Sequence, residues 1–140
     1  MPAIIRSHSQ LTDNEYEQQF KSCTFKPRLF THEAHLRLAW IHIRKYGLEQ
    51  AEINLCDDII RFANHVGFET KFNRTITIAS AKIMHYFMSI SDASSFDDFI
   101  TEFPDLLLDF KRVLAQHYSF DIIKNEEARK TYLPPDLIPF

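Results

Sequence analysis

Two histidines near the start of one predicted helix are the residues best suited to chemistry in this chain. The sequence predicts a helix over residues 31–46, and His32 and His35 lie in its first turn. Side chains three residues apart on a helix are neighbours, so the two imidazoles can share a ligand. The positive end of the helix dipole disfavours imidazolium, and neutral imidazole is the form that binds a metal or acts as a general base. We therefore take His32 and His35 as the candidate catalytic residues.

A metal site is one interpretation of this pair. The sequence from His32 to His35 is not the zinc-protease motif, in which the two histidines are four residues apart. His42 lies about 10 Å from His35 along the helix axis, at about 1.5 Å per residue, which is too far to bind the same ion. If His32 and His35 bind a metal, further ligands must come from elsewhere, and the candidates are Asn73, Cys56, Asp57 and His85.

A small anionic ligand is the interpretation that uses more of the polar residues. A helix N-terminus presents free backbone N–H groups and positive potential to a phosphate or carboxylate. The predicted helices 31–46 and 48–66 are separated only by Gly47, and we expect them to form an antiparallel hairpin that returns the chain to the histidines. The candidate ligand-binding residues at the start of the next predicted helix are Asn73, Thr75 and Thr77.

Arg37 is a further candidate for ligand binding, because its guanidinium presents paired donors to an anion. The helical projection places Arg37 away from His32 and His35. An ion pair with Glu33 or with Asp109 is the alternative role for this side chain.

A purely structural role for the histidines is the competing interpretation. His32 would then cap and pack, and His35 and His42 would form hydrogen bonds inside the core. Thr75 and Thr77 would bond to the start of their own helix. In that case the protein is a non-catalytic interaction or adaptor protein whose apolar C-terminal tail binds a partner.

The apolar pattern predicts an all-α fold, a compact array of five to six helices in a single domain over residues 1–140. The helix at 31–46 is apolar nearly all round, which is typical of a central, buried helix. Residues 1–10 are expected to form a loose lead-in. Residues 132–140 contain three prolines and are expected to form an extended tail packed on the body. The other helical patterns cover residues 12–22, 48–66, 74–90, 96–103, 105–117 and 119–131.

Local signals predict several helix boundaries. Thr12, Thr31 and Ser95 are residue types that cap the N-terminus of a helix. Gly47 and Gly67 follow apolar periodic stretches and are placed to end helices.

The composition excludes several classes of protein. A chain of 140 residues with 45% hydrophobic and 14% aromatic residues can bury a core of its own. A net charge of −3 argues against general nucleic-acid binding. Two glycines are too few for an all-β fold with many tight turns, or for a Gly-rich phosphate loop.

The sequence also predicts where the protein is found. No apolar run is long enough for a signal peptide or for a membrane span of about 20 residues. We therefore expect a cytoplasmic protein that does not bind membranes, in which Cys23 and Cys56 are reduced thiols. The sequence points to no particular cofactor.

Three blocks of residues resemble a family of small, all-helical bacterial proteins. The first block is similar to Phe-x-His-x-x-His-(Leu/Val)-Arg-x-Ala-Trp and is met by Phe30, His32, His35, Leu36, Arg37, Ala39 and Trp40. The second is similar to Lys-(Tyr/Phe)-His-x-Thr-x-Thr and is met by Lys71, Phe72, Thr75 and Thr77. The third combines Pro-Asp-Leu with two later motifs and is met by Pro104, Asp105, Leu106, Tyr118, Ser119, Ala128, Arg129, Tyr132, Pro135 and Asp136.

This resemblance covers nearly the whole chain after residue 12. It implies a helical fold and a polar site near His32, and it implies no particular reaction. One departure is Asn73, which stands where the second block of the family has a histidine. If that histidine takes part in chemistry in relatives, its role is lost or weakened in this chain.

Overall fold

Helices make up all the regular secondary structure that the structure describes. The computed structural model describes residues 4–140, apart from the side chain of Glu69. It contains no strand in that range, which confirms the predicted all-α fold. None of its helices is long and apolar enough to cross a lipid bilayer. The α-helices are α1 (Asp13–Lys21), α2 (His32–Tyr46), α3 (Leu48–Val66), α4 (Arg74–Ser89), α5 (Phe96–Glu102), α6 (Asp105–Leu108), α7 (Phe110–Ala115) and α8 (Glu126–Lys130).

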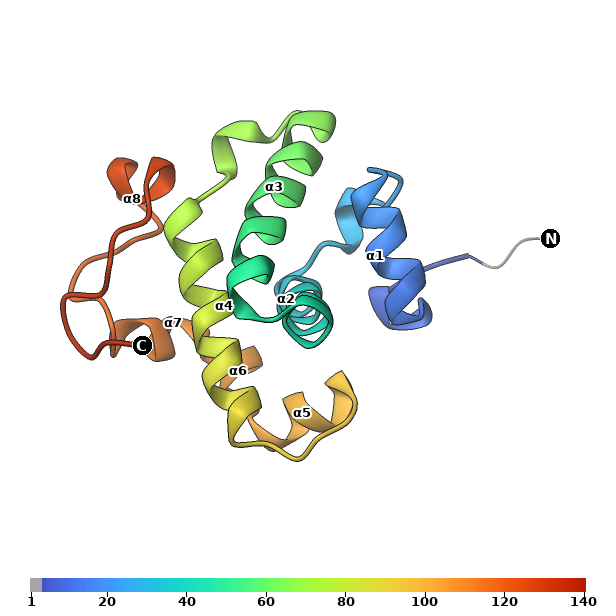
Figure 1. The fold of residues 1–140 in the computed structure, drawn as a ribbon. Helices are drawn as coiled ribbons and strands as arrows, with labels where there is room; N and C mark the ends of the chain where they lie inside the picture. Colours follow the sequence, from blue (N-terminus) through green and yellow to red (C-terminus); the bar gives the residue numbers. More distant parts are fainter. Residues whose placement is uncertain (1–3) are drawn as a thin grey trace.

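Helix α2 is central and buried, as its nearly continuous apolar surface predicts. In Figure 1 it is viewed almost end-on, with α1 on one side and the α3–α4 pair on the other. It contacts all three of these helices. Trp40 is buried against the ring of Phe99 in α5, with ring centroids 4.9 Å apart. The other buried apolar residues of α2 are Ala34, Leu36, Leu38, Ala39, Ile41 and Ile43.

The predicted antiparallel hairpin of α2 and α3 is wrong. Figure 1 shows α3 and α4 side by side in the plane of the picture, whereas α2 crosses them. Gly47 forms the corner. It is the single residue between α2 and α3 and caps both helices, and its φ of 82° and ψ of 166° are far from helical values. Glycine adopts such a positive φ readily because it has no Cβ. The second helix therefore leaves in a new direction.

Capping residues begin and end the main helices as the sequence predicts. The hydroxyl oxygens of Thr12, Thr31 and Ser95 each accept a hydrogen bond from the backbone N–H three residues further on, at 3.1–3.2 Å. Gly67 ends α3 in the left-handed region, with a φ of 82° and a ψ of 21°. These local signals are confirmed because each one satisfies backbone groups that a helix end leaves unpaired.

The predicted helix over residues 105–117 is interrupted. Asp109, with a φ of −147° and a ψ of 47°, separates α6 from α7. In a continuous helix the N–H of Phe110 would donate to the carbonyl of Leu106. That carbonyl instead accepts a hydrogen bond from Nε2 of His32, 2.9 Å away in α2. A tertiary contact thus replaces a helical one at this point.

The predicted helix over residues 119–131 is also shorter in the structure. Only Glu126–Lys130 (α8) is helical, and Asn125 caps it by accepting from the N–H of Ala128 at 2.9 Å. Before Asn125 the chain runs through turns, in which the N–H of Ser119 donates to the Asp136 carboxylate at 2.9 Å. Ser119 is therefore a contact for the tail rather than a helix start.

The C-terminal tail lies against the body of the protein. The N–H groups of Leu137 and Ile138 donate to the carbonyls of His117 and Gln116 at 3.0 and 3.2 Å. The hydroxyl of Tyr118 donates to the Leu133 carbonyl at 2.8 Å. Backbone pairing therefore attaches the tail beside the end of α7.

Thr75 attaches the tail to α4. Its side chain is completely buried, and its hydroxyl donates to the carbonyl of Thr131 at 2.8 Å and accepts from the N–H of Leu133 at 3.0 Å. A Thr75→Val substitution keeps the shape of the side chain but leaves both backbone groups without a partner. We expect the free energy of unfolding to fall by about 1–3 kcal/mol, as measured by chemical denaturation.

The matched control for this change is Thr101→Val. Thr101 is exposed on α5, and its hydroxyl donates to the Asp97 carbonyl. Water can replace this bond, so we expect a change within about 0.5 kcal/mol. Equal losses in the two variants would show that the buried Thr75 bonds do not stabilise the tail.

The segment predicted as a loose lead-in is bonded to α2 through His8, whereas residues 1–3 lie outside the described part. Ser7 caps a short 3-10 helix, His8–Gln10, and His8 is buried. The guanidinium of Arg37 donates to the carbonyls of His8 and Leu11 at 2.6 and 2.8 Å. These bonds explain why the segment packs on the body.

Candidate functional site

A pocket of about 610 Å³ lies where α2, α3, α4 and the α6–α7 segment meet. Three of the predicted site residues, His32, His35 and Thr77, are in its wall. The wall also contains Ser80, Asp109 and Lys111. The rest of the wall is apolar and almost entirely aliphatic: Leu36, Ala39, Leu55, Ile59, Ile76, Leu107, Leu108, Phe110, Leu114 and Ile123.

Two contacts fix the orientation of the His35 imidazole. Its Nδ1 atom is 2.8 Å from the carbonyl oxygen of Thr31, and its ring stacks on Phe30 with ring centroids 3.5 Å apart and an interplanar angle of 21°. A carbonyl oxygen only accepts hydrogen bonds, so Nδ1 must carry the proton. In the neutral ring Nε2 is then an acceptor.

The surroundings of His35 favour its neutral form. Burial is the main effect and lowers its pKa to about 4, opposed by the hydrogen bond to Thr31. The side chain of His35 is nevertheless exposed to solvent where it lines the pocket. Water in the pocket offsets part of the loss of solvation, and the direction of the shift leaves the ring neutral at pH 7.

His32 has a structural contact that occupies one of its nitrogens. Its Nε2 donates to the carbonyl of Leu106 at 2.9 Å, and its ring lies 5.1 Å from that of Phe110. This histidine therefore holds the α6–α7 segment against α2 at the pocket. The sequence predicts that His32 and His35 share a site, and the structure places both rings in one wall with separate hydrogen-bond partners.

Asn73 and Thr75 are not in the pocket. Asn73 caps α4 by accepting from the N–H of Ile76 at 2.9 Å, and its amide donates to the carbonyl of Ile122 at 2.7 Å. Thr75 binds the tail, as described above. Of the three predicted residues at the start of α4, only Thr77 reaches the pocket, and its hydroxyl donates to the Asn73 carbonyl at 2.8 Å.

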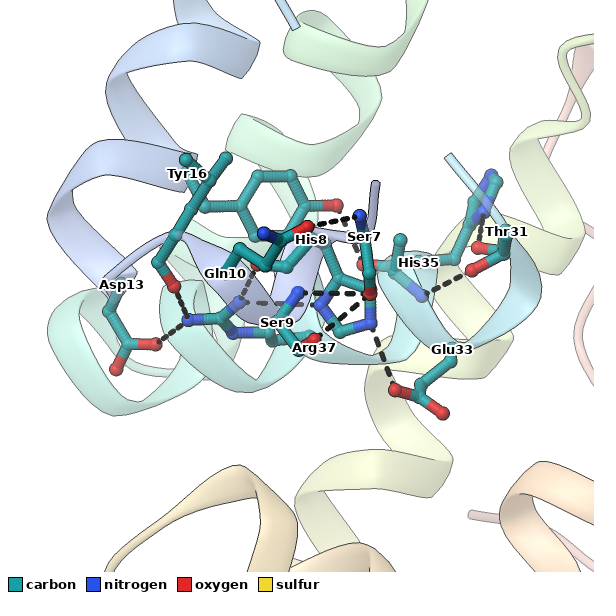
Figure 2. Close-up of polar contacts among 12 residues, drawn as sticks. Ser7, His8, Ser9, Gln10, Asp13, Tyr16, Thr31, Glu33, His35 and Arg37 are labelled. Carbon is teal, nitrogen blue, oxygen red and sulfur yellow. Dashed lines mark hydrogen bonds and ion pairs between the residues drawn. The ribbon is translucent and has the colours of Figure 1, made fainter. Parts of the chain in front are cut away.

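Arg37 lies outside the pocket, in a buried cluster at the N-terminal segment. Its guanidinium donates to the Asp13 carboxylate at 2.9 Å. Asp13 thus takes the place of Glu33 and Asp109, the partners considered from the sequence. Figure 2 shows His8 between Arg37 and Glu33, and shows His35 beside Thr31, away from this cluster.

His8 completes the Arg37 cluster. Its Nε2 is 2.9 Å from the Glu33 carboxylate, and its Nδ1 is 3.3 Å from the Arg37 guanidinium. Arginine only donates, so Nδ1 must accept and Nε2 must carry the proton. Burial lowers the pKa of His8, although Glu33 acts in the opposite direction. The cluster therefore uses neutral His8 to connect two charged groups.

Residues 4–140 contain no group of three or more His, Cys, Asp or Glu side chains placed to hold a metal ion. Cys56 is buried, and burial raises the pKa of its thiol to about 11. Asp57 and His85 are exposed and do not line the pocket. The described side chains thus give His32 and His35 no further metal ligands.

His42 lies in the core on another side of α2. Its Nδ1 is 3.4 Å from the amide nitrogen of Asn54, and its Nε2 is 3.8 Å from the Asp58 carboxylate. Burial lowers the pKa of His42, with Asp58 opposing the shift. This side chain takes no part in the pocket.

Three polar residues of the pocket were not predicted as site residues. Ser80 is one helical turn from Thr77, and its place on the apolar stripe of α4 was an available signal. Asp109 and Lys111 reach the pocket because α6 and α7 are separate helices. At that interruption the Leu106 carbonyl accepts a hydrogen bond from His32, 74 residues away in the sequence. No local sequence pattern predicts such a contact.

No family model, curated protein or solved structure matches this chain. The resemblance to a bacterial family and the meaning of Asn73 in place of a histidine therefore stay predictions. The roles described above rest on the contacts of the chain itself.

Proposed function

We propose that the protein binds a small, largely apolar molecule in the pocket between α2, α3, α4 and the α6–α7 segment. The observation that carries this proposal is the volume of about 610 Å³ inside an aliphatic wall. Protein interiors are normally close-packed, and pockets of about 300–1,000 Å³ with few polar groups are typical of small-molecule sites. A cytoplasmic location agrees with this proposal and stays a prediction.

The test is occupancy of the pocket by a neutral apolar dye, Nile red, whose fluorescence rises in apolar surroundings. We expect saturable binding to the protein. A Ser80→Phe variant places an aromatic ring in the pocket from α4 and should weaken binding at least tenfold. The matched control is His85→Phe, the same new side chain on an exposed position of α4, which should bind like the parent.

Circular dichroism of each variant establishes that α4 is intact. Binding of the dye that is unchanged in a folded Ser80→Phe variant would overturn the proposal, because the dye would then occupy another surface. Absence of any saturable binding by the parent would overturn it as well.

Partner binding through the C-terminal tail is the second candidate function. The observation in its favour is the exposure of the side chains of Leu137, Ile138 and Phe140. The backbone N–H groups of Leu137 and Ile138 are already paired with the body, so the tail could offer only side chains to a partner. The pocket therefore has the stronger support.

A further inference from the structure

His35 presents one unpaired nitrogen in the wall of the pocket. The carbonyl of Thr31 accepts from both the backbone N–H and the Nδ1–H of His35, at 2.9 and 2.8 Å. Nε2 has no hydrogen-bond partner among residues 4–140. The stacking of the ring on Phe30 restricts its rotation. The lone pair of Nε2 is thus held in a fixed direction.

Two hydroxyl groups of α4 also line the pocket and limit which ligand groups can bind there. The proton of the Thr77 hydroxyl is used in the bond to the Asn73 carbonyl, so the oxygen of Thr77 can only accept from a ligand. The Ser80 hydroxyl also lines the pocket and can donate or accept. Among the polar residues of α2 and α4 that line the pocket, Nε2 of His35 and the hydroxyl oxygen of Thr77 are therefore hydrogen-bond acceptors.

An anion finds fewer partners on this side of the pocket. A carboxylate only accepts hydrogen bonds at pH 7, so it could bind Nε2 of His35 only after the ring takes up a second proton. The surroundings of His35 oppose that step. Lys111 is the one cationic side chain in the wall among the described residues, and it is exposed.

We propose that the ligand is an aliphatic molecule with a neutral hydroxyl group, which donates its hydrogen bond to Nε2 of His35. This inference rests on the proposed function and narrows the class of ligand. The aliphatic wall surrounds the hydrocarbon part, and the fixed imidazole selects a donor over an acceptor or an anion. Leaving Nε2 unpaired beside a ligand without a donor costs binding energy, which is the origin of the selectivity.

Three probes of similar length test the inference: octanol, octyl methyl ether and octanoate. Their dissociation constants are measured by displacement of Nile red from the parent protein. Octanol should bind about five- to tenfold more tightly than the ether, which keeps the oxygen but lacks the donor. Octanoate should bind more weakly than octanol. The His35→Phe variant keeps a ring beside Phe30 and should bind octanol and the ether equally.

A second measurement does not depend on that variant folding. Nitrogen NMR of the parent should report a protonated Nδ1 and an unprotonated Nε2 in His35, with the Nε2 signal shifting on addition of octanol and not on addition of the ether. A proton on Nε2 in the free protein would overturn the inference. So would equal affinity for octanol and the ether.

The outcomes separate the two proposals. Displacement of the dye by all three probes with equal affinity would leave the pocket as a binding site and overturn only the role of His35. Tightest binding of octanoate, lost in Lys111→Met and kept in Arg112→Met, would replace the hydroxyl ligand by an anion held at Lys111. Failure of every probe to displace the dye would remove the proposed function together with the inference.

Discussion

Replacing Arg37 with methionine is expected to lower the free energy of unfolding by about 2–3 kcal/mol. The guanidinium is buried and donates to the carbonyls of His8 and Leu11 and to the Asp13 carboxylate. Methionine replaces the aliphatic part of the arginine side chain but donates no hydrogen bond. The two carbonyls lose their partner, and of the hydrogen bonds that join the segment before α1 to α2, only the one between His8 and Glu33 is left.

Urea denaturation of the parent and the variant measures this loss. Arg112→Met is the matched control, because Arg112 is exposed and its nearest carboxylate oxygens, on Asp105 and Asp109, are 3.7 and 3.8 Å away. Surface pairs of this kind contribute little, so the control should stay within about 0.5 kcal/mol of the parent. A loss from Arg37→Met no larger than that of the control would mean that the buried cluster does not stabilise the N-terminal segment.

Acidification from pH 7 to pH 4 is expected to destabilise the protein through three histidines. Burial lowers the pKa values of His8, His35 and His42 below the ordinary value of 6.5, to about 4 for His35. Each ring therefore binds protons more weakly in the folded than in the unfolded protein. The free energy of unfolding is highest above pH 6.5 and falls as the pH drops from there toward the folded-state pKa values.

We expect a combined loss on the order of 1 kcal/mol, most of it from His8 and His42, because His35 is exposed and solvent screens its charge. Urea denaturation at a series of pH values measures this loss. Nearby carboxylates, Glu33 at His8 and Asp58 at His42, reduce the loss because they favour protonation. The double variant His8→Gln/His42→Gln should show a smaller slope of stability between pH 7 and pH 5. A slope equal to that of the parent would exclude these two histidines as the cause.

The fold could be predicted where a local pattern decides the structure. The cap at Thr31 and the glycines at positions 47 and 67 begin or end helices through bonds within a few residues, and the structure confirms each of them. The direction of α3 could not be predicted, because the presence of a glycine at position 47 does not determine its backbone angles. Glycine permits many conformations, and packing of the whole chain selects one.

The candidate site could be predicted in part, where local helix signals place its residues. His32, His35 and Thr77 come to one pocket because each lies near the start of a helix that the sequence marks clearly. Asn73 and Thr75 lie at the same helix start but bond to Ile122, Thr131 and Leu133, far along the chain. A single sequence does not reveal such long-range partners.

The shared corner at Gly47 limits where this chain can change in length. One residue added to the start of α3 would rotate the rest of that helix by about 100° relative to Gly47, and Leu55 and Ile59 would leave the pocket wall that they now form. The connection between α3 and α4, residues 67–73, is different, because Gly67 ends α3 and a separate residue, Asn73, begins α4. Among chains that share this fold, insertions and deletions should therefore collect between α3 and α4 and be absent between α2 and α3.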